Sequence, residues 1–190
     1  MYDNNSTKVK IGKVRFSYLH VFQPSANQEG QQPKYSITLI IPKSNTELVA
    51  SIQQAITNAY NAGLGTFGGK KPTVWRNPLR DGDTERPEDE AFADAYFINA
   101  SSKTKPGIVK WGPLGKLVEI TDEQELYSGC YGYASVNFFA YNFNGNKGIG
   151  CGLNNILKTD NGDYLGGRAS AQSDFGDMQP ETEDMPEEIC

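Results

Sequence analysis

The segment from Tyr131 to Leu153, YGYASVNFFAYNFNGNKGIGCGL, constrains the fold more than any other part of this chain. It contains six aromatic residues, then Asn144-Gly145, and then a glycine at every second position. Asn-Gly is the strongest sequence preference for the two central residues of a type I′ hairpin turn. The segment is therefore predicted to form a long β-hairpin that turns at Asn144-Gly145.

Counting outward from this turn predicts which residues of the hairpin face each other. One set of facing pairs is apolar and is assigned to the core: Ala140 with Ile149, Phe138 with Cys151, and Val136 with Leu153. The other set places aromatic or amide side chains opposite glycine or asparagine: Phe143 with Asn146, Tyr141 with Gly148, Phe139 with Gly150, and Asn137 with Gly152. Glycine fills no volume and weakens a strand, so the second face is expected to be an open platform for a planar ligand. The alternative is that the rings only cover the glycines, as aromatic residues do in barrels.

A long bent strand is predicted near the N-terminus. Residues 8–22 alternate between apolar and polar side chains, but the phase slips at Gly12. The apolar phase is held by Val9 and Ile11 before the glycine and by Val14, Phe16 and Tyr18 after it. A β-bulge at the glycine keeps one face apolar and the other basic, as in strands that close small barrels.

Further strands are predicted over residues 34–42, 95–101 and 116–120. A helix follows the first of them, with a capping box of Ser44 and Glu47, a terminal Gly63, and a buried stripe of Leu48, Ile52, Ile56 and Ala59. Residues 63–94 have no clean period and form a long excursion. The predicted fold is mainly β: a five-stranded, oligonucleotide-binding (OB) fold-like Greek-key barrel with one inserted helix and long loops.

The charge of the chain is segregated along the sequence. The net charge is -5, but residues 174–190 hold seven acids without a Lys or Arg, and residues 81–94 hold seven acids and one Arg. Outside both stretches, 17 basic residues face 9 acidic ones. We expect a disordered N-terminus over residues 1–7, a mildly basic domain over residues 8–173, and an acidic disordered tail over residues 174–190.

Other features narrow the functional classes. No stretch approaches the roughly 18 apolar residues that span a bilayer, and the polar N-terminus lacks a signal core, so a cytoplasmic protein without a membrane partner is expected. Three cysteines and one histidine have no metal-ligand spacing. Free thiols are favoured over a Cys130–Cys151 disulfide, and no metal or cofactor is predicted. The sequence leaves the oligomeric state open.

Rings beside cations favour sequence-independent binding of single-stranded nucleic acid, because every base has a face that stacks on an aromatic ring. The predicted platform residues are Tyr131, Tyr133, Phe139 and Tyr141. The cations predicted to hold the phosphates are Lys10, Lys13, Arg15, Lys34, Lys103, Lys105 and Lys147. No helix suits the major groove, so duplex DNA is not the expected ligand.

Two other classes stay open at this stage. The acidic segment RDGDTERPEDE contains enough carboxylates to gather Mg²⁺ for a nuclease. Its acids are adjacent on one loop, whereas nuclease carboxylates converge from separate elements, so a non-enzymatic protein is favoured. A structural or interaction protein of a virus particle would also account for a barrel with a tail.

Several stretches resemble a family of phage and prophage single-stranded-DNA-binding proteins. The resemblance is carried by GKVRFSYLHVFQP, PKYSITLIIPKS, YSGCYGYASVNFFAYNFNGNKGIGCGLNNILK and GDYLGGRASAQSDF, together with the segment from Pro78 to Val109. It implies an OB barrel and a role in covering single strands during phage DNA replication or recombination. It also implies that the acidic tail recruits replication or recombination proteins, with Asp184, Glu187, Glu188 and Ile189 at the end of the tail as the contact residues.

The acidic tail also imitates a phosphate backbone. A polyanion tethered beside a basic groove should compete with DNA for that groove, most strongly at low salt. The alternative is a tail that only keeps the protein in solution.

Overall fold

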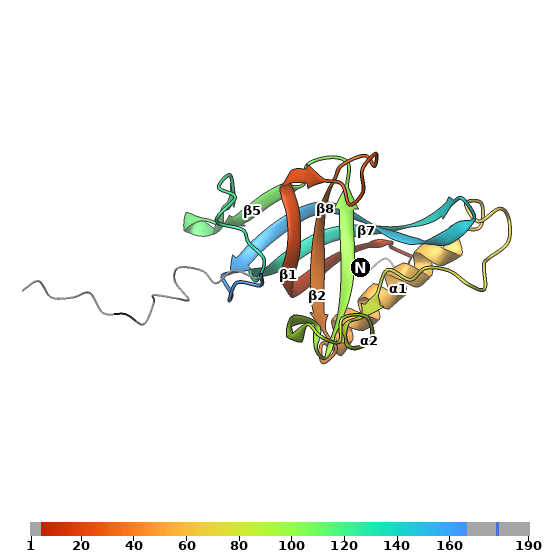
Figure 1. Cartoon of the computed structure of the whole chain (residues 1–190), viewed down its shortest axis with the longest axis horizontal. Helices are drawn as coiled ribbons and strands as arrows, with labels where there is room; N and C mark the ends of the chain where they lie inside the picture. Colours follow the sequence, from red (N-terminus) through yellow and green to blue (C-terminus); the bar gives the residue numbers. More distant parts are fainter. Residues whose placement is uncertain (1–4, 167–177, 179–190) are drawn as a thin grey trace, which may run out of the picture.

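The strands and helices follow the predicted order, with additions in the long loops. The structure is a computed structural model that describes residues 5–166 and Met178 (Figure 1). The strands are β1 (Lys8–Ser25), β2 (Lys34–Pro42), β3 (Arg80–Asp81), β4 (Ala95–Ser102), β5 (Gly107–Trp111), β6 (Leu117–Glu119), β7 (Tyr131–Phe143) and β8 (Asn146–Asp160). The helices are α1 (Thr46–Ala62) and α2 (Gly82–Glu85), and single 3-10 turns lie at Glu90–Phe92 and Pro113–Gly115.

Five of the strands close into a barrel. Neighbouring strands follow the order β4-β2-β1-β7-β8, and a parallel pairing of Ser101 in β4 with Gly152 in β8 closes the ring. Strand β3 extends the sheet beyond β4, while β5 and β6 extend it beyond β8. The predicted five-stranded OB-like barrel is therefore confirmed, and β3, β5 and α2 are elements that the sequence patterns did not indicate.

The β7–β8 hairpin has the predicted turn and register. Asn144 and Gly145 both have positive φ, 49° and 79°, as a type I′ turn requires. Every predicted facing pair is present, from Phe143 with Asn146 to Val136 with Leu153. Of the apolar set, Ala140 is half-buried and the other five residues are buried in the core. The alternation of the apolar set with the aromatic and amide set thus determines which face of the hairpin is exposed to solvent.

The pairing of strand β1 has three irregularities, of which the sequence predicted the first; the third lies between His20 and Ser25. The pairing with β7 skips a residue between Ile11 and Val14, as expected from Gly12. A second irregularity lies between Ser17 and His20 in the pairing with β2. It turns Tyr18, which we expected on the apolar side, out to the surface. The prediction for Tyr18 was wrong because this bulge contains no glycine to reveal it.

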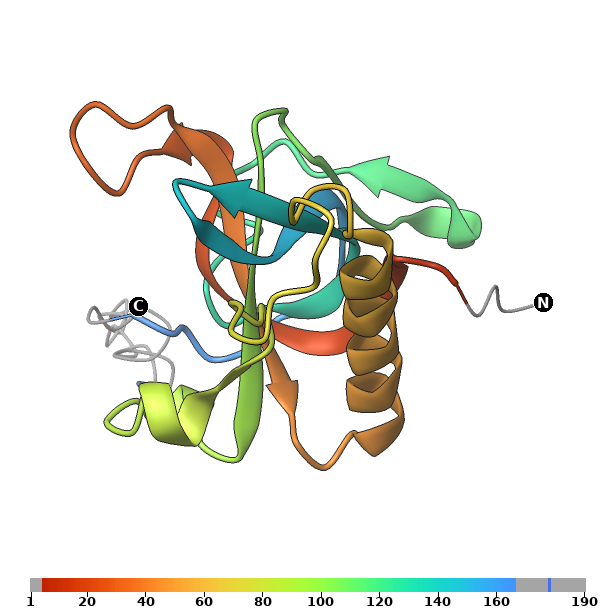
Figure 2. The same ribbon diagram turned by 90° about the vertical axis from the view of Figure 1, so that its right-hand side faces the viewer.

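Helix α1 lies along one side of the barrel, and the loop that follows it crosses past the β7–β8 hairpin (Figure 2). The predicted stripe of Leu48, Ile52, Ile56 and Ala59 is buried, and Gly63 ends the helix as expected. The N-cap is Asn45 rather than Ser44, since the Asn45 side chain accepts a hydrogen bond from the Leu48 amide at 3.3 Å. Asparagine and serine cap equally well, so the sequence could not separate these adjacent positions.

The two residues just before β1 are bonded to the rest of the domain. The Ser6 carbonyl accepts a bond from Asn58 at 2.9 Å, and the Thr7 carbonyl accepts one from the Phe138 amide at 2.9 Å. These contacts place Ser6 and Thr7 with the barrel rather than with the segment expected to be disordered.

Cys130 and Cys151 are buried free thiols. Within the described part of the chain, no helix is long and apolar enough to cross a membrane.

Candidate nucleic-acid interface

Two adjoining cavities form one groove across the outside of the barrel. Both are lined by Lys34 of β2 and by Asn99 and Ser101 of β4, so they are continuous. We call the pair the β2–β4 groove. Its ring half reaches the β7–β8 hairpin, and its polar half reaches the second bulge of β1. The two halves enclose about 720 and 590 Å³ respectively.

The ring half contains the predicted aromatic platform. Phe139 is 46% exposed and Tyr141 is half-buried, and both line the cavity. A Cβ atom on Gly150 would lie only 2.6 Å from Cζ of Phe139, so the ring rests directly on this glycine. The rings therefore cover glycines, as the alternative interpretation held, and Phe139 still leaves nearly half of its surface open to a ligand.

Three cations surround this platform: Lys34, Arg76 and Arg80. The backbone of Arg76 is tied to β8, donating to the Lys147 carbonyl and accepting from the Ile149 amide, both at 3.0 Å. Arg80 is paired with Glu85 and lies 5.0 Å from the Phe97 ring centroid. Among the residues that the structure describes, no hydrogen bond or ion pair engages the side chains of Lys34 and Arg76. Both remain available to a phosphate.

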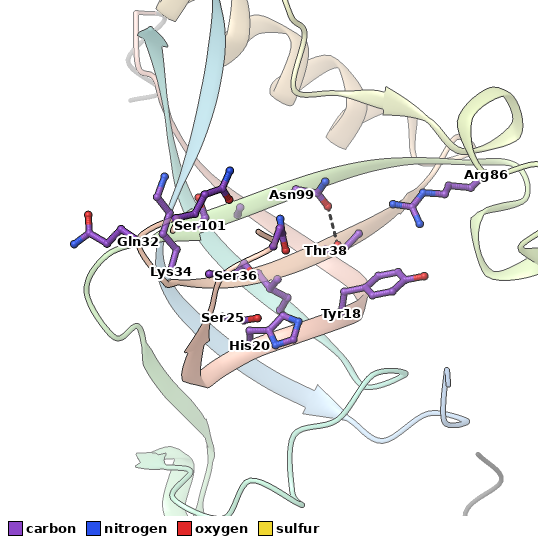
Figure 3. Close-up of a pocket in the computed structure, with 15 residues that line it drawn as sticks. Tyr18, His20, Ser25, Gln32, Lys34, Ser36, Thr38, Arg86, Asn99 and Ser101 are labelled. Carbon is purple, nitrogen blue, oxygen red and sulfur yellow. Dashed lines mark hydrogen bonds between the residues drawn. The ribbon is translucent and has the colours of Figure 1, made fainter. Parts of the chain in front are cut away.

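The polar half is rich in amides and hydroxyls. Figure 3 shows Tyr18 and Arg86 together at one end of this cavity and Lys34, Gln32 and Ser101 toward the other. On its floor, Thr38 donates a hydrogen bond to Oδ1 of Asn99 at 2.7 Å. This bond uses the amide oxygen of Asn99 and not its amide nitrogen. Such groups can bind phosphate and sugar oxygens, and contacts of that kind do not depend on the nucleotide sequence.

Several predicted contact residues lie elsewhere on the barrel. Lys13 is paired with Asp160, and Arg15 donates to the carbonyls of Gly129 and Asp163. Both cations lie over the Tyr131 ring, 5.9 and 5.5 Å from its centroid. This cluster fastens the end of β8 to β1 and does not line the β2–β4 groove.

The other predicted residues are also dispersed. Tyr133 is exposed and lies over Gly12, and Lys10 lines a cavity beside α1. Lys103 and Lys105 lie in the turn after β4, with Lys105 5.8 Å from the Phe22 ring centroid. Lys147 donates to the Phe67 carbonyl at 2.9 Å and so attaches the loop that follows α1 to β8. The tail residues Asp184, Glu187, Glu188 and Ile189 lie outside the described residues.

Among the groove residues that sequence patterns missed are one aromatic ring and three cations: Tyr18, Arg76, Arg80 and Arg86. The three arginines belong to the excursion over residues 63–94, whose length and lack of period were the only signals of a functional loop. Nothing in that stretch indicates which of its side chains reach the barrel. Of the predicted residues, the groove thus brings together Lys34, Phe139 and Tyr141.

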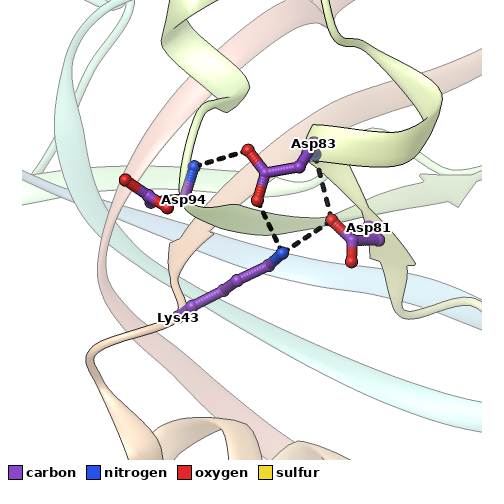
Figure 4. A network of polar contacts seen from close by, with 4 residues as sticks. All are labelled: Lys43, Asp81, Asp83 and Asp94. Atoms are coloured by element: carbon purple, nitrogen blue, oxygen red, sulfur yellow. Dashed lines mark hydrogen bonds and ion pairs between the residues drawn. The ribbon is translucent and has the colours of Figure 1, made fainter.

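The acidic loop that suggested a nuclease is occupied by a structural ion-pair network (Figure 4). Lys43 contacts Asp81 at 2.8 Å and Asp83 at 2.6 Å, and Asp83 also accepts from the Asp94 amide at 2.9 Å. The hydrogen bond from Lys43 lowers the pKa of both carboxyl groups and raises that of the lysine. Within residues 5–166, no three His, Cys, Asp or Glu side chains are arranged to hold a metal ion.

This network predicts a pH-dependent stability effect. The lowered pKa values of Asp81 and Asp83 mean that their ion pairs stabilise the fold above the ordinary value of 3.8. That stabilisation is lost as the pH falls through the lowered values. Lys43→Met should therefore reduce the free energy of unfolding at pH 7, and the difference from the wild type should shrink below pH 3.8. Urea unfolding at both pH values measures this, and an equal loss at pH 7 and at strongly acidic pH would contradict it.

This chain is similar to three phage proteins in sequence or in fold. The protein called putative protein p50 of Acyrthosiphon pisum secondary endosymbiont phage 1 is 29% identical over 180 residues, which cover 90% of this chain and 94% of that protein. The single-stranded DNA-binding protein of bacteriophage Enc34, solved in complex with ssDNA, superposes with a TM-score of 0.74 at 24% identity, over 84% of this chain and 90% of that one. The bacteriophage T7 single-stranded DNA-binding protein gp2.5 gives 0.59 at 12% identity, over 86% and 97%.

The two solved structures show that this chain shares its fold with phage proteins. The family model described as the ssDNA-binding protein of Enterobacter phage Enc34 matches residues 7–186. That range begins just before β1 and includes residues 174–186 of the acidic segment, but not Glu187, Glu188 and Ile189. This chain therefore belongs to the family of the Enterobacter phage Enc34 ssDNA-binding protein.

Proposed function

We propose that this protein binds single-stranded DNA in the β2–β4 groove without sequence preference and without catalysis. The observation that carries the proposal is the half-exposed Phe139 ring beside Lys34 and Arg76, two cations without an acidic partner among the described residues. Aromatic stacking combined with a positive groove is the general solution for single strands. The Enc34 protein, of the same family and fold, was solved in complex with ssDNA.

The shape of the groove favours a single strand over a duplex. The rings lie on a strand pair, and the cations around them come from β2, from β3 and from the loop before β3 rather than from a projecting helix. Stacking on Phe139 requires a base whose face is open, which a paired and stacked base does not offer. We propose that this activity covers exposed strands during phage DNA replication or recombination, in the cytoplasm of the host cell.

Titration of fluorescently labelled oligo-dT and of a duplex of equal length tests the proposal. Affinity for oligo-dT should exceed affinity for the duplex at moderate salt, and oligomers of other sequences should bind similarly. Equal affinity for both forms would contradict the proposed groove. No binding of either would favour a structural or interaction protein, and Mg²⁺-dependent loss of the label would favour the nuclease alternative.

The acidic tail provides a second element of the proposal. Residues 174–190 carry seven acids and no Lys or Arg, whereas the groove carries Lys34, Arg76, Arg80 and Arg86. We propose that the tail competes with DNA for these cations. We also propose that, once DNA displaces it, the tail binds replication or recombination proteins through Asp184, Glu187, Glu188 and Ile189.

Removing residues 174–190 should tighten the binding of oligo-dT at low salt and have a smaller effect at high salt. Screening explains the difference, because the Debye length falls from about 30 Å at 0.01 M to about 8 Å at 0.15 M. A full-length control with the seven acids replaced by Asn and Gln should behave like the truncated chain. An unchanged affinity at low salt in both variants would remove the competition from the proposal.

A further inference from the structure

Tyr18 has a backbone conformation that bulky residues rarely adopt. Its φ of 47° lies in the left-handed region, and it sits where the pairing of β1 with β2 jumps from Ser17 to His20. Glycine is usual at a left-handed bulge position, because any Cβ atom there crowds the following carbonyl oxygen. Strained non-glycine residues of this kind gather at functional sites.

The bulge moves the ring of Tyr18 from the core to the groove. Phe16, two residues earlier, is fully buried, and regular alternation would bury Tyr18 as well. Instead the side chain is 49% exposed and lines the polar half of the groove (Figure 3). Bulges next to binding sites often re-aim a side chain in this way.

Arg86 is held next to this ring by aromatic contacts. Its guanidinium carbon lies 5.5 Å from the ring centroids of Tyr18, Phe92 and Phe97. In the part of the chain that the structure describes, nothing forms an ion pair or a hydrogen bond with this guanidinium. A guanidinium fixed in this way keeps its fork of N–H donors free, and that fork matches the oxygens of a phosphate.

We infer that Tyr18 and Arg86 form a second nucleotide subsite, in which a base stacks on Tyr18 and Arg86 binds the adjoining phosphate. The inference rests on the proposed binding of single-stranded DNA. Tyr18 lines only the polar half of the groove and Phe139 only the ring half. We therefore expect the two rings to contact different nucleotides of one strand.

The test compares Tyr18→Gly with Trp111→Ala, a control that removes a 57% exposed ring outside the groove. Tyr18→Gly should lower the affinity for oligo-dT by about five- to 150-fold, the range expected for one stacked base. Its Tm should change little, because glycine adopts the left-handed conformation without strain. Tyr18→Phe keeps the ring and should lose much less affinity, and Trp111→Ala should bind like the wild type. A purely structural Tyr18 would instead lower the Tm of the glycine variant and leave its affinity normal.

Two further measurements test whether Tyr18 and Arg86 form the second subsite. Arg86→Met should reduce the slope of log K against log salt by about 0.7, the value for one phosphate contact with a single strand. The losses from Tyr18→Gly and Phe139→Ala should multiply in the double variant, because rings that line different halves of the groove should act independently. If the wild type binds oligo-dT and both groove variants match it, or if the two losses fail to multiply, the second subsite is wrong. If the wild type itself does not bind, the proposed function fails first.

Discussion

Replacing Lys34 and Arg76 together by alanine should weaken the binding of single-stranded DNA and flatten its dependence on salt. Each phosphate contact with a single strand contributes about 0.7 to the slope of log K against log salt, because binding releases counterions. Two lost contacts should therefore reduce the slope by about 1.4. The loss of affinity should be largest at low salt, where counterion release favours binding most.

These two residues give a clear test because their side chains contribute little to the stability of the free protein. Neither side chain forms an ion pair or hydrogen bond with another residue that the structure describes. Arg76→Ala also keeps the backbone bonds to Lys147 and Ile149 that fasten the loop to β8. The Tm should accordingly stay close to that of the wild type.

The matched control is Lys8→Ala with Lys116→Ala, two exposed lysines that do not line the groove. It makes the same change in net charge, so it reports the effect of the overall field of the protein. Salt titrations of the three proteins with oligo-dT measure both slope and affinity. Equal slopes for the groove variant and the control would mean that the phosphates bind somewhere else.

The hairpin was predictable because its signal is local. Asn144-Gly145 fixes the turn, and a period of two residues then fixes which side chains face the core. The same reasoning found the bulge at Gly12 and the stripe of α1. Each of these features is determined by neighbours in the sequence, and the register of β7 with β8 follows without any knowledge of the rest of the barrel.

The cationic part of the groove was not predictable in this way. Arg76, Arg80 and Arg86 reach the groove because the excursion over residues 63–94 folds back on the barrel, through bonds such as the Arg76 amide to the Lys147 carbonyl. Those contacts join residues about seventy positions apart in the chain and leave no periodic trace. The re-aimed Tyr18 was missed for a related reason, because its bulge contains no glycine.

Lys13 and Arg15 show a different limit of pattern analysis. Alternation correctly placed them on the outside of β1, but the outside of a barrel is not one surface. They emerge near Tyr131 and Asp160, away from the β2–β4 groove. Alternation separates inside from outside, whereas the direction in which an outward residue points depends on the curvature and closure of the whole sheet.

Replacing Phe139 and Tyr141 together by alanine should have the largest effect on DNA binding of any change in the ring half of the groove. Stacking of one base on an aromatic side chain contributes about 1–3 kcal/mol, so each ring accounts for roughly five- to 150-fold in affinity. The loss should differ little between low and high salt, since stacking releases no counterions. That separates it from the loss of Lys34 and Arg76.

The fold should tolerate this double change. Phe139 is 46% exposed and Tyr141 is half-buried, while the core side of the same hairpin is formed by Phe138, Cys151 and their neighbours. Phe143→Ala is the matched control, because it removes a 70% exposed ring from the same strand without altering the groove lining. Oligo-dT titration and thermal unfolding of the three proteins are the measurements.

The two interpretations of the rings predict opposite results in this experiment. If Phe139 and Tyr141 serve mainly to cover Gly150 and Gly148, their removal exposes the backbone of β8, so the Tm falls and the folded fraction binds DNA normally. If they are the surface on which bases stack, the Tm stays near that of the Phe143→Ala control and the affinity falls. The open face of Phe139 favours the second result, as does its place beside Lys34 and Arg76, whose side chains have no partner among the described residues. Normal affinity in a destabilised double variant would remove the ring half from the proposed binding site.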